Sequence, residues 1–314
     1  MESTFYCSPG SLCLLSGLAT RQQIQVDEVR QVPLPEGAMI NGIITDVDLM
    51  VDFLDSVAKE YALKKQAAAA NPLLAQRSVI VIQASNIVTK IMEVPPLDEF
   101  HVRQFIQREF TQYADTSTAE PSELYDYTVL NQVGPEGGVQ VLAASASREM
   151  IADYRQAFAL AGYKVEQIGI GVESLIKLVG LIPDLVGKTY LLVQVEATRQ
   201  IVTMFLDGTF RLSNGYRLIS EPGSDEWVAE VGQNLASVIQ FNRAQRGQTE
   251  LGSALFAGMT PTNLEKLKSR FDYLNITIAN FDLSHVIKVS ANITAETHFD
   301  PGNFLFNLGA LIKR

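Results

Sequence analysis

A block of three short strands, a helix and one further strand occurs twice along this sequence, and this repetition limits the folds open to the chain. In the first block, Ser-Pro-Gly and Ser-Gly segments separate the three expected strands, which are Thr4–Cys7, Leu12–Leu15 and Gln23–Val29. A helix start follows at Thr45–Asp48, and Ser78–Ile82 is a β-branched run typical of a buried strand. The order of the first block is therefore three strands, helix, strand.

The second block repeats this order in the other half of the chain. Its expected strands are Tyr190–Val195, Ile201–Leu206 and Thr209–Leu212. Asp207-Gly208 favours a type I′ hairpin turn between the last two. Ser224 opens a helix with one apolar face, and Ser253–Gly258 reads as a short apolar strand. Two such blocks predict two lobes of similar structure, although they share no obvious residue identity.

A compact α+β segment is expected between the two blocks. Pro95-Pro96 ends a strand at Ile87–Val94, and a helix follows whose apolar stripe is predicted to face a core. The members of this stripe are Val102, Phe105, Ile106 and Phe110. Strands at Tyr127–Leu130 and Val139–Ala144 come next, and a further helix begins at Ser147 and ends at Gly162. The segment is expected to be a compact α+β insertion of about 80 residues.

Length, composition and charge bound the class of protein. With 314 residues, 47% of them hydrophobic, the chain suggests two domains, or one domain with a large insertion. Its net charge of −10 opposes binding to the phosphate backbone of a nucleic acid. Nucleic acid is therefore not expected as a partner.

The sequence also predicts a cytosolic protein. Cys7 and Cys13 are too few for a disulfide framework and lack zinc-site spacing, and residues 1–5 do not resemble a signal peptide. The most apolar later stretch, Ile168–Ile182, contains charged residues and is too short to cross a bilayer. Any link to a membrane is expected to run through a partner.

Residues that could carry catalysis do not form a known pattern. His101, His285 and His298 are far apart and show neither metal-ligand nor triad spacing. Cys7 has no basic neighbour and is expected to be a small buried residue, not a reactive thiol. Gly134–Gly138 lacks the Gly-Lys-Ser/Thr ending of a phosphate loop and favours a hairpin turn. No catalytic residue and no metal site is predicted.

Several segments, in their order along the chain, resemble the PilM family of type IV pilus assembly proteins, which are actin-like and related to FtsA. The most specific is Val141–Ile151, followed by Ala161-Gly162-Tyr163 and Glu173-Ser174-Leu175, which looks like the return from the family's inserted subdomain 1C. Val88–Pro95 resembles the start of that insert, and Asn303–Arg314 resembles the last helix of the family. The resemblance covers nearly the whole chain.

The resemblance implies an α/β, actin-like fold of duplicated ribonuclease H-like lobes with an inserted α+β 1C subdomain. Lobe 1 is expected at 1–184, with subdomain 1C at about 85–168, and lobe 2 at 185–314. A C-terminal helix at about 302–314 is a candidate to pack back on subdomain 1A. Tyr216–Gly223 leads almost directly into the helix of Trp227, so subdomain 2B is expected to be reduced or missing.

Three loops depart from the family pattern at the positions that would hold a nucleotide. Where the family has Asp-x-Gly after the first strand, this chain has Ser8-Pro9-Gly10, with no acidic residue and one amide donor lost to proline. Where the family has Val-Asp-x-Gly in the second block, Gln194 replaces the carboxylate and Glu196 replaces the glycine. The adenine-side Gly-Gly turn becomes Ala257-Gly258. These positions predict a degenerate nucleotide site with no tight binding of ATP or Mg²⁺.

The family likeness thus implies a non-enzymatic cytoplasmic scaffold, peripheral to the inner membrane through its partners. The implied partner is the N-terminal tail of a PilN-like inner-membrane protein, lying extended between subdomains 1A and 1C, with pilus motor or platform components as further partners. Arg103 and Gln104, the polar neighbours of the apolar stripe, are candidates to face a partner. The alternatives are an active actin-like ATPase or sugar-kinase-like enzyme, and the cytoplasmic domain of a type II secretion protein of the GspL kind.

Overall fold

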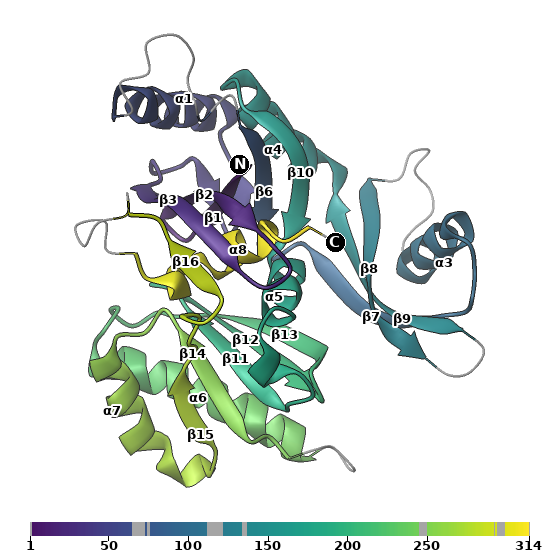
Figure 1. Ribbon diagram of the computed structural model, residues 1–314, viewed down its shortest axis with the longest axis vertical. Coiled ribbons are helices and arrows are strands. Elements are labelled where there is room, and N and C mark those ends of the chain that lie inside the picture. The colour runs from purple at the N-terminus through teal and green to yellow at the C-terminus, as the bar shows by residue number, and fades with distance from the viewer. Residues whose placement is uncertain are drawn as a thin grey trace. The chain divides into compact units, whose positions relative to one another are not determined.

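The structure of the chain is a computed structural model that describes residues 2–64, 73, 76–111, 122–133, 137–244, 250–291, 293 and 299–313 (Figure 1). The chain divides into two compact units. One unit combines Met1–Val32 with Ser174–Arg314, and the other is Pro33–Glu173. The lobe boundary expected near residue 184 and the limits of subdomain 1C stay predictions.

The first unit contains the N-terminal meander, which forms as expected. Strands β1, β2 and β3 lie side by side in this order, and β16 pairs parallel to the outer edge of β3. Their bounds are β1 Glu2–Ser8, β2 Ser11–Ala19, β3 Ile24–Pro33 and β16 Ile287–Val289. Pairing of Ser8 with Ser11 leaves a two-residue turn, Pro9-Gly10, and Gly10 has the positive φ of 84° that glycine adopts without steric cost.

The same unit contains the second meander in a five-stranded sheet of order β13-β12-β11-β14-β15. The bounds are β11 Tyr190–Val195, β12 Arg199–Leu206, β13 Thr209–Arg217, β14 Ser253–Ala257 and β15 Thr277–Asn280. Asp207 and Gly208 both have positive φ, as the predicted type I′ turn requires. Helices α6 (Asp225–Ala244) and α7 (Pro261–Phe271) cover one face of this sheet through a core of alternate strand residues and helix side chains.

The link between β13 and α6 is short. Only residues 218–224 separate Arg217 from Asp225, and the Ser224 hydroxyl accepts a hydrogen bond from the Trp227 amide at 3.1 Å, which caps the helix. Seven residues cannot form a helical subdomain. The predicted reduction of subdomain 2B is therefore confirmed.

The C-terminal segment, predicted as a helix at about 302–314, consists of a 3₁₀ turn (Pro301–Phe304) and a short helix, α8 (Leu305–Ala310); Arg314 lies outside the described residues. Within its unit, α8 packs on β1 and β2, the purple strands beside the yellow helix in Figure 1. The Asn307 side-chain amide donates to the carbonyls of Thr4 and Cys13, and thus bridges the two strands. Helix α5 (Gly171–Val179) leads into this unit, which also contains the 3₁₀ turns Pro183–Leu185 and Asp272–Leu274.

The second unit contains two further parts of the predicted order. Helix α1 (Val47–Lys64) begins where the Asp46 carboxylate accepts from the Leu49 amide, and it packs against α4 (Arg148–Leu160). Strands β6 (Arg77–Ile82) and β10 (Lys164–Ile170) pair in parallel, and β4 (Met39–Ile40) and β5 (Ile43–Ile44) form a small hairpin. The three-strand, helix, strand order of the first block is thus present in the structure, as it is in the second.

The α+β insertion also folds as predicted. Its antiparallel sheet has the order β7-β9-β8, and α3 (Glu99–Thr111) packs on one face. The strands are β7 Val88–Val94, β8 Glu123–Val133 and β9 Gly138–Ser147. Val102 and Ile106 of the apolar stripe are buried, and Phe105 and Phe110 pack against them half-buried. In the described parts of the chain, no helix is both long and apolar enough to cross a membrane.

Candidate functional site

The two-residue turn between β1 and β2 is held by its own side chains. The Ser8 hydroxyl lies 2.7 Å from the Ser11 hydroxyl and donates to the Ser11 carbonyl at 3.1 Å, and the Gln31 amide donates to the Ser11 hydroxyl at 2.9 Å. Pro9 has no amide hydrogen to offer, and the turn carries no charged side chain. A phosphate would meet few donors here, because the hydroxyl groups are already paired with one another.

The second of the three loops that depart from the family pattern follows β11. A network of charged and polar side chains around Glu196 occupies it. The Oε1 atom of Glu196 accepts from the Tyr6 hydroxyl at 2.7 Å and from the Gln194 amide at 3.1 Å. Its Oε2 atom accepts from the Arg199 guanidinium, from Nε at 2.9 Å and from Nη2 at 2.7 Å. The Arg199 guanidinium also contacts the Tyr6 hydroxyl. Both oxygens of the carboxylate are therefore bound by the protein itself.

The surroundings keep this network largely out of water. The Glu196 side chain is 12% exposed and that of Arg199 is 18% exposed, and Tyr6 is fully buried. Burial, and then the neighbouring Glu196 carboxylate, raise the pKa of Tyr6 well above its ordinary value. Tyr6 therefore stays neutral and keeps the proton that it donates to Glu196. Removing one partner of this ion pair would leave a largely buried, unpaired charge, which lowers the stability of the fold.

Tyr6 and Cys13 join the two loop positions. Tyr6 faces Cys13 across the β1–β2 pair, and the Cys13 thiol lies 3.9 Å from the Ser8 hydroxyl. On its other side, the Tyr6 ring makes an edge-to-face contact of 4.8 Å between ring centres with Phe306 of α8. The network thus fastens β1, the turn after β11 and the C-terminal helix into one cluster.

Gly258, the glycine kept in the third loop, has a packing role. It follows β14 with a positive φ of 80°, and a Cβ atom added to it would lie 2.2 Å from the Val195 carbonyl oxygen. A Cβ atom on Gly302 would in turn lie 2.7 Å from the Gly258 nitrogen. Backbone from two other segments therefore lies directly against Gly258, where a side chain would not fit.

The structure thus brings Ser8, Gly10, Gln194, Glu196, Ala257 and Gly258 into one region of the first unit, and it adds two residues that the sequence did not reveal. These are Tyr6 and Arg199. The Glu-x-x-Arg spacing across the β11–β12 turn was a signal for Arg199, whereas Tyr6 pairs with a residue 190 positions away. The Gln194 Oε1 atom is buried and has no hydrogen-bond partner among the described residues.

The charged side chains at the second loop are paired with each other. A phosphate needs free N–H groups or cations, and Mg²⁺ needs free carboxylate oxygens, but Arg199 and Glu196 satisfy each other. Among the described residues, no group of three His, Cys, Asp or Glu side chains is placed to bind a metal. His101 and His285 each lie beside an aspartate of the same short segment, and His298 lies outside the described residues.

Arg103 and Gln104, the candidates to face a partner, lie on α3 in the second unit, and both are exposed. The Arg103 guanidinium pairs with Glu99 at 3.1 Å and with Asp126 at 3.3 Å, and it lies 5.7 Å from the centre of the Tyr127 ring. Local contacts therefore hold Arg103 against the insertion, and the neighbouring Gln104 is exposed.

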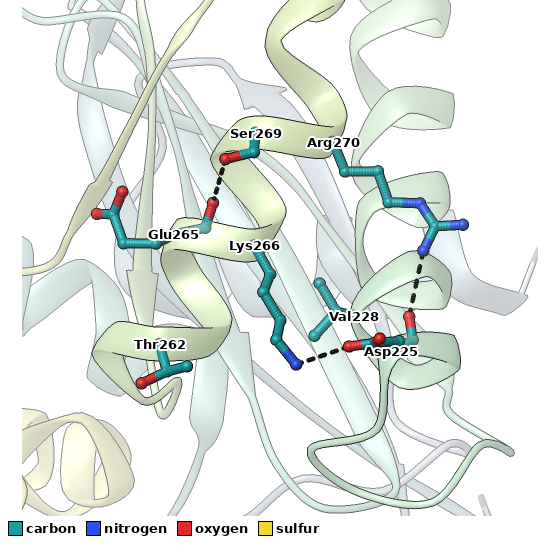
Figure 2. Close-up of a pocket in the computed structure, with 7 residues that line it drawn as sticks. All are labelled: Asp225, Val228, Thr262, Glu265, Lys266, Ser269 and Arg270. Carbon is teal, nitrogen blue, oxygen red and sulfur yellow. Dashed lines mark hydrogen bonds and ion pairs between the residues drawn. The ribbon is translucent and has the colours of Figure 1, made fainter.

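The groove between α6 and α7 offers no catalytic arrangement. It has a volume of about 770 Å³ and is shallow, and Figure 2 shows Lys266 and Arg270 reaching across it to Asp225. The Lys266 amine pairs with the Asp225 carboxylate at 2.6 Å, and Arg270 donates to the Asp225 carbonyl at 3.4 Å. The groove is thus a contact between helices whose charges are already paired.

The comparisons with known proteins give a fold and no family assignment. No family model matches the chain, and no curated protein matches its sequence. The fold is similar to that of a chain in the solved "PilM-PilN type IV pilus biogenesis complex", with a TM-score of 0.77 over 99% of this chain and 97% of that one. The two sequences are 14% identical, so the likeness concerns the fold alone. The predicted actin-like α/β fold is confirmed.

Two further solved structures are more distant, each with a TM-score of 0.49. One is a protein of unknown function with an actin-like ATPase fold from Bacteroides thetaiotaomicron, 10% identical, covering 89% of this chain and 90% of its own. The other is the cytoplasmic domain of EpsL, an inner-membrane component of the type II secretion system of Vibrio cholerae. It is 12% identical and covers 99% of this chain and 95% of its own.

Replacing Glu196 with Gln leaves Arg199 without its counter-charge. We expect Glu196→Gln to lower the free energy of unfolding by about 2 kcal/mol, because the pair is mostly buried. The double variant Glu196→Gln, Arg199→Met should recover about half of the loss. Urea unfolding measures both. The control Glu265→Gln breaks an exposed pair on α7 and should change the value by less than about 0.5 kcal/mol. Equal effects of the buried and exposed variants would contradict the described role of the network.

The two buried thiols predict a loss of stability in alkali. Burial raises the pKa of both Cys7 and Cys13 to about 12, from an ordinary value of 9.0. Their contribution is fully present below pH 9 and is lost as pH rises toward 12, because the unfolded chain releases these protons first. Between about pH 9 and about pH 10, the free energy of unfolding should fall increasingly steeply. Its slope should approach about 1.4 kcal/mol per pH unit for each thiol.

The double variant Cys7→Ala, Cys13→Ala lacks both thiols and keeps every tyrosine. It therefore separates the ionisation of the thiols from that of the tyrosines. Urea unfolding under reducing conditions over this pH range should give a flatter dependence for the variant. The same slope in both proteins would show that the thiols are not buried as described.

Proposed function

We propose that this chain is a scaffold of a type IV pilus assembly or related secretion machine, working in the cytoplasm beside the inner membrane. The observation that carries the proposal is the Glu196 carboxylate, which Tyr6, Gln194 and Arg199 bind on both oxygens at a position where the fold's ATPases need a phosphate loop. A further support is the fold shared with a chain of the PilM–PilN complex. The scaffold holds the N-terminal tail of a PilN-like membrane protein.

The absence of ATPase activity is part of the proposal. Glu196 repels a phosphate group approaching this loop, and Pro9 removes an amide donor from the first turn. Removing Arg199 from Glu196 to bind a phosphate would break a largely buried ion pair, so the exchange is unfavourable. We therefore propose that neither ATP nor Mg²⁺ binds tightly.

Calorimetric titration of Mg-ATP into the full chain tests this point. We expect no saturable binding up to about millimolar nucleotide, because the side-chain donors of both loops are already paired. Micromolar binding that Ser8→Ala or Gln194→Ala abolishes would overturn the proposal and favour an active ATPase or a sugar-kinase-like enzyme.

The insertion offers an edge for an extended tail. Strand β7 lies at one edge of the β7-β9-β8 sheet, and Val88 at its start is 50% exposed. An extended peptide can pair with such an edge through its main chain while shallow pockets take alternate side chains. We propose that the PilN-like tail lies along β7, and that the exposed Arg103 and Gln104 on α3 face another component of the machine.

A matched pair of variants tests this placement. Val88 on β7 and Val129 on β8 are about equally exposed, at 50% and 48%, on opposite edges of one sheet. Val88→Glu should weaken binding of a labelled tail peptide by about tenfold or more, whereas Val129→Glu should leave it nearly unchanged. Fluorescence anisotropy with the N-terminal peptide of the neighbouring membrane-protein gene measures both. No binding of any such tail would contradict the function, and equal effects of the two variants would contradict the placement alone.

A further inference from the structure

Strand β13 is an open edge of the five-stranded sheet in the first unit. It spans nine residues, Thr209–Arg217, and among the described strands it pairs only with β12. Every second residue of an edge strand directs its backbone N–H and C=O groups away from the sheet. Because only residues 218–224 lead from β13 to α6, no subdomain follows the strand to cover this edge.

The edge carries positive charge in a chain that is strongly acidic. Residues 209–220 contain no Asp or Glu, whereas Arg211 and Arg217 are both exposed. Arg217 lies opposite Arg199 in the β12–β13 register, and the charge of Arg199 is already paired with Glu196. Among the described residues, no carboxylate lies within ion-pair distance of Arg211 or Arg217. The positive charges of Arg199 and Arg217 lie side by side on neighbouring strands. Such a pair is unfavourable unless an anion binds beside it.

The centre of the same edge is bare. Gly215 is exposed, and a Cβ atom placed on it would meet no atom within 4 Å. Glycine inside a strand weakens it, and often marks a place where another backbone approaches closely. Beyond Arg217, the Ile219 side chain is 85% exposed, while the Ile219 and Ser220 amides donate to the Glu230 carboxylate at 3.1 Å, so the free edge ends at Arg217. No side chain therefore covers the sheet face at Gly215 beside the edge, and Arg211 and Arg217 lie on either side of it along the strand.

The charges also disfavour the symmetric pairing of two copies of this chain along the full length of β13. An antiparallel pair of β13 strands centred on Asn214 would place Arg211 of each copy opposite Arg217 of the other. Like charges directly opposite one another are destabilising, and native sheets use such charges to prevent pairing between identical edges. An acidic strand instead places carboxylates beside Arg211 and Arg217, so the interaction is attractive.

We propose that β13 is a second docking edge, which binds an extended acidic segment of a partner protein as an additional strand. The main chain of the partner pairs with the free edge of β13, and its carboxylates pair with Arg211 and Arg217. This inference concerns a surface in the first unit and does not depend on the proposed binding of a tail at β7.

Peptide binding to the full chain tests the proposal. The probe is a fluorescein-labelled peptide of alternating Thr and Glu, about as long as β13, and its counterpart has Lys in place of Glu. We expect fluorescence anisotropy to show binding of the Glu peptide and not of the Lys peptide. Arg211→Glu with Arg217→Glu should weaken the Glu peptide by about tenfold or more. N-methylation of alternate peptide amides should weaken it as much, because the main-chain donors are lost.

A matched control is Arg21→Glu with Arg155→Glu, which changes the net charge equally at two other exposed positions. This control and Val88→Glu should both bind the Glu peptide as the original chain does. Failure of the Glu peptide to bind, equal binding by the β13 variant, or no effect of N-methylation would each overturn the proposal. So would a dimer in sedimentation analysis that the β13 charge reversal abolishes, because it would assign the edge to a second copy. Circular dichroism confirms that each variant is folded.

Discussion

The ion pair between Glu196 and Arg199, with the Tyr6 hydroxyl bound to both, is the interaction on which the rest of the first unit depends. Tyr6 comes from β1 and contacts Phe306 of α8, while Glu196 and Arg199 flank the turn between β11 and β12. Three segments far apart in sequence are thus joined at a place with little access to water. A largely buried charge is tolerated only when it is paired, so these residues constrain one another.

This pairing supports the proposal that the chain uses its fold without ATPase chemistry. The chain keeps the duplicated order of strands and helices, and it keeps a glycine at 258 because backbone packs against it. At the loops, hydroxyl groups pair with hydroxyl groups and the carboxylate pairs with the guanidinium. The proposed scaffold role depends on edges and surfaces more than on free donors, and β7 and β13 offer such edges.

Periodicity and turn residues were sufficient to predict both blocks, the insertion and the short link before α6, because these features depend on neighbouring residues. Gln194 and Glu196 could be recognised as departures only through the resemblance to the family pattern. The role of Tyr6 could not be predicted from the sequence, since it depends on a contact between residues 190 positions apart. The final helix is shorter than the family resemblance implies: Leu311 is buried beyond its end, and Lys313 pairs with Glu2.

The Arg199 side chain itself gives the most direct test of the central claim, that an internal ion pair occupies the region where a nucleotide's phosphates would bind. In the ¹⁵N NMR spectrum of the arginine-labelled chain, Arg199 should show an Nε–H signal protected from exchange, because this group donates to Glu196. The signal should disappear in Glu196→Gln and stay unchanged when Mg-ATP is added. An unprotected Arg199 signal, or one that Mg-ATP shifts, would contradict the account.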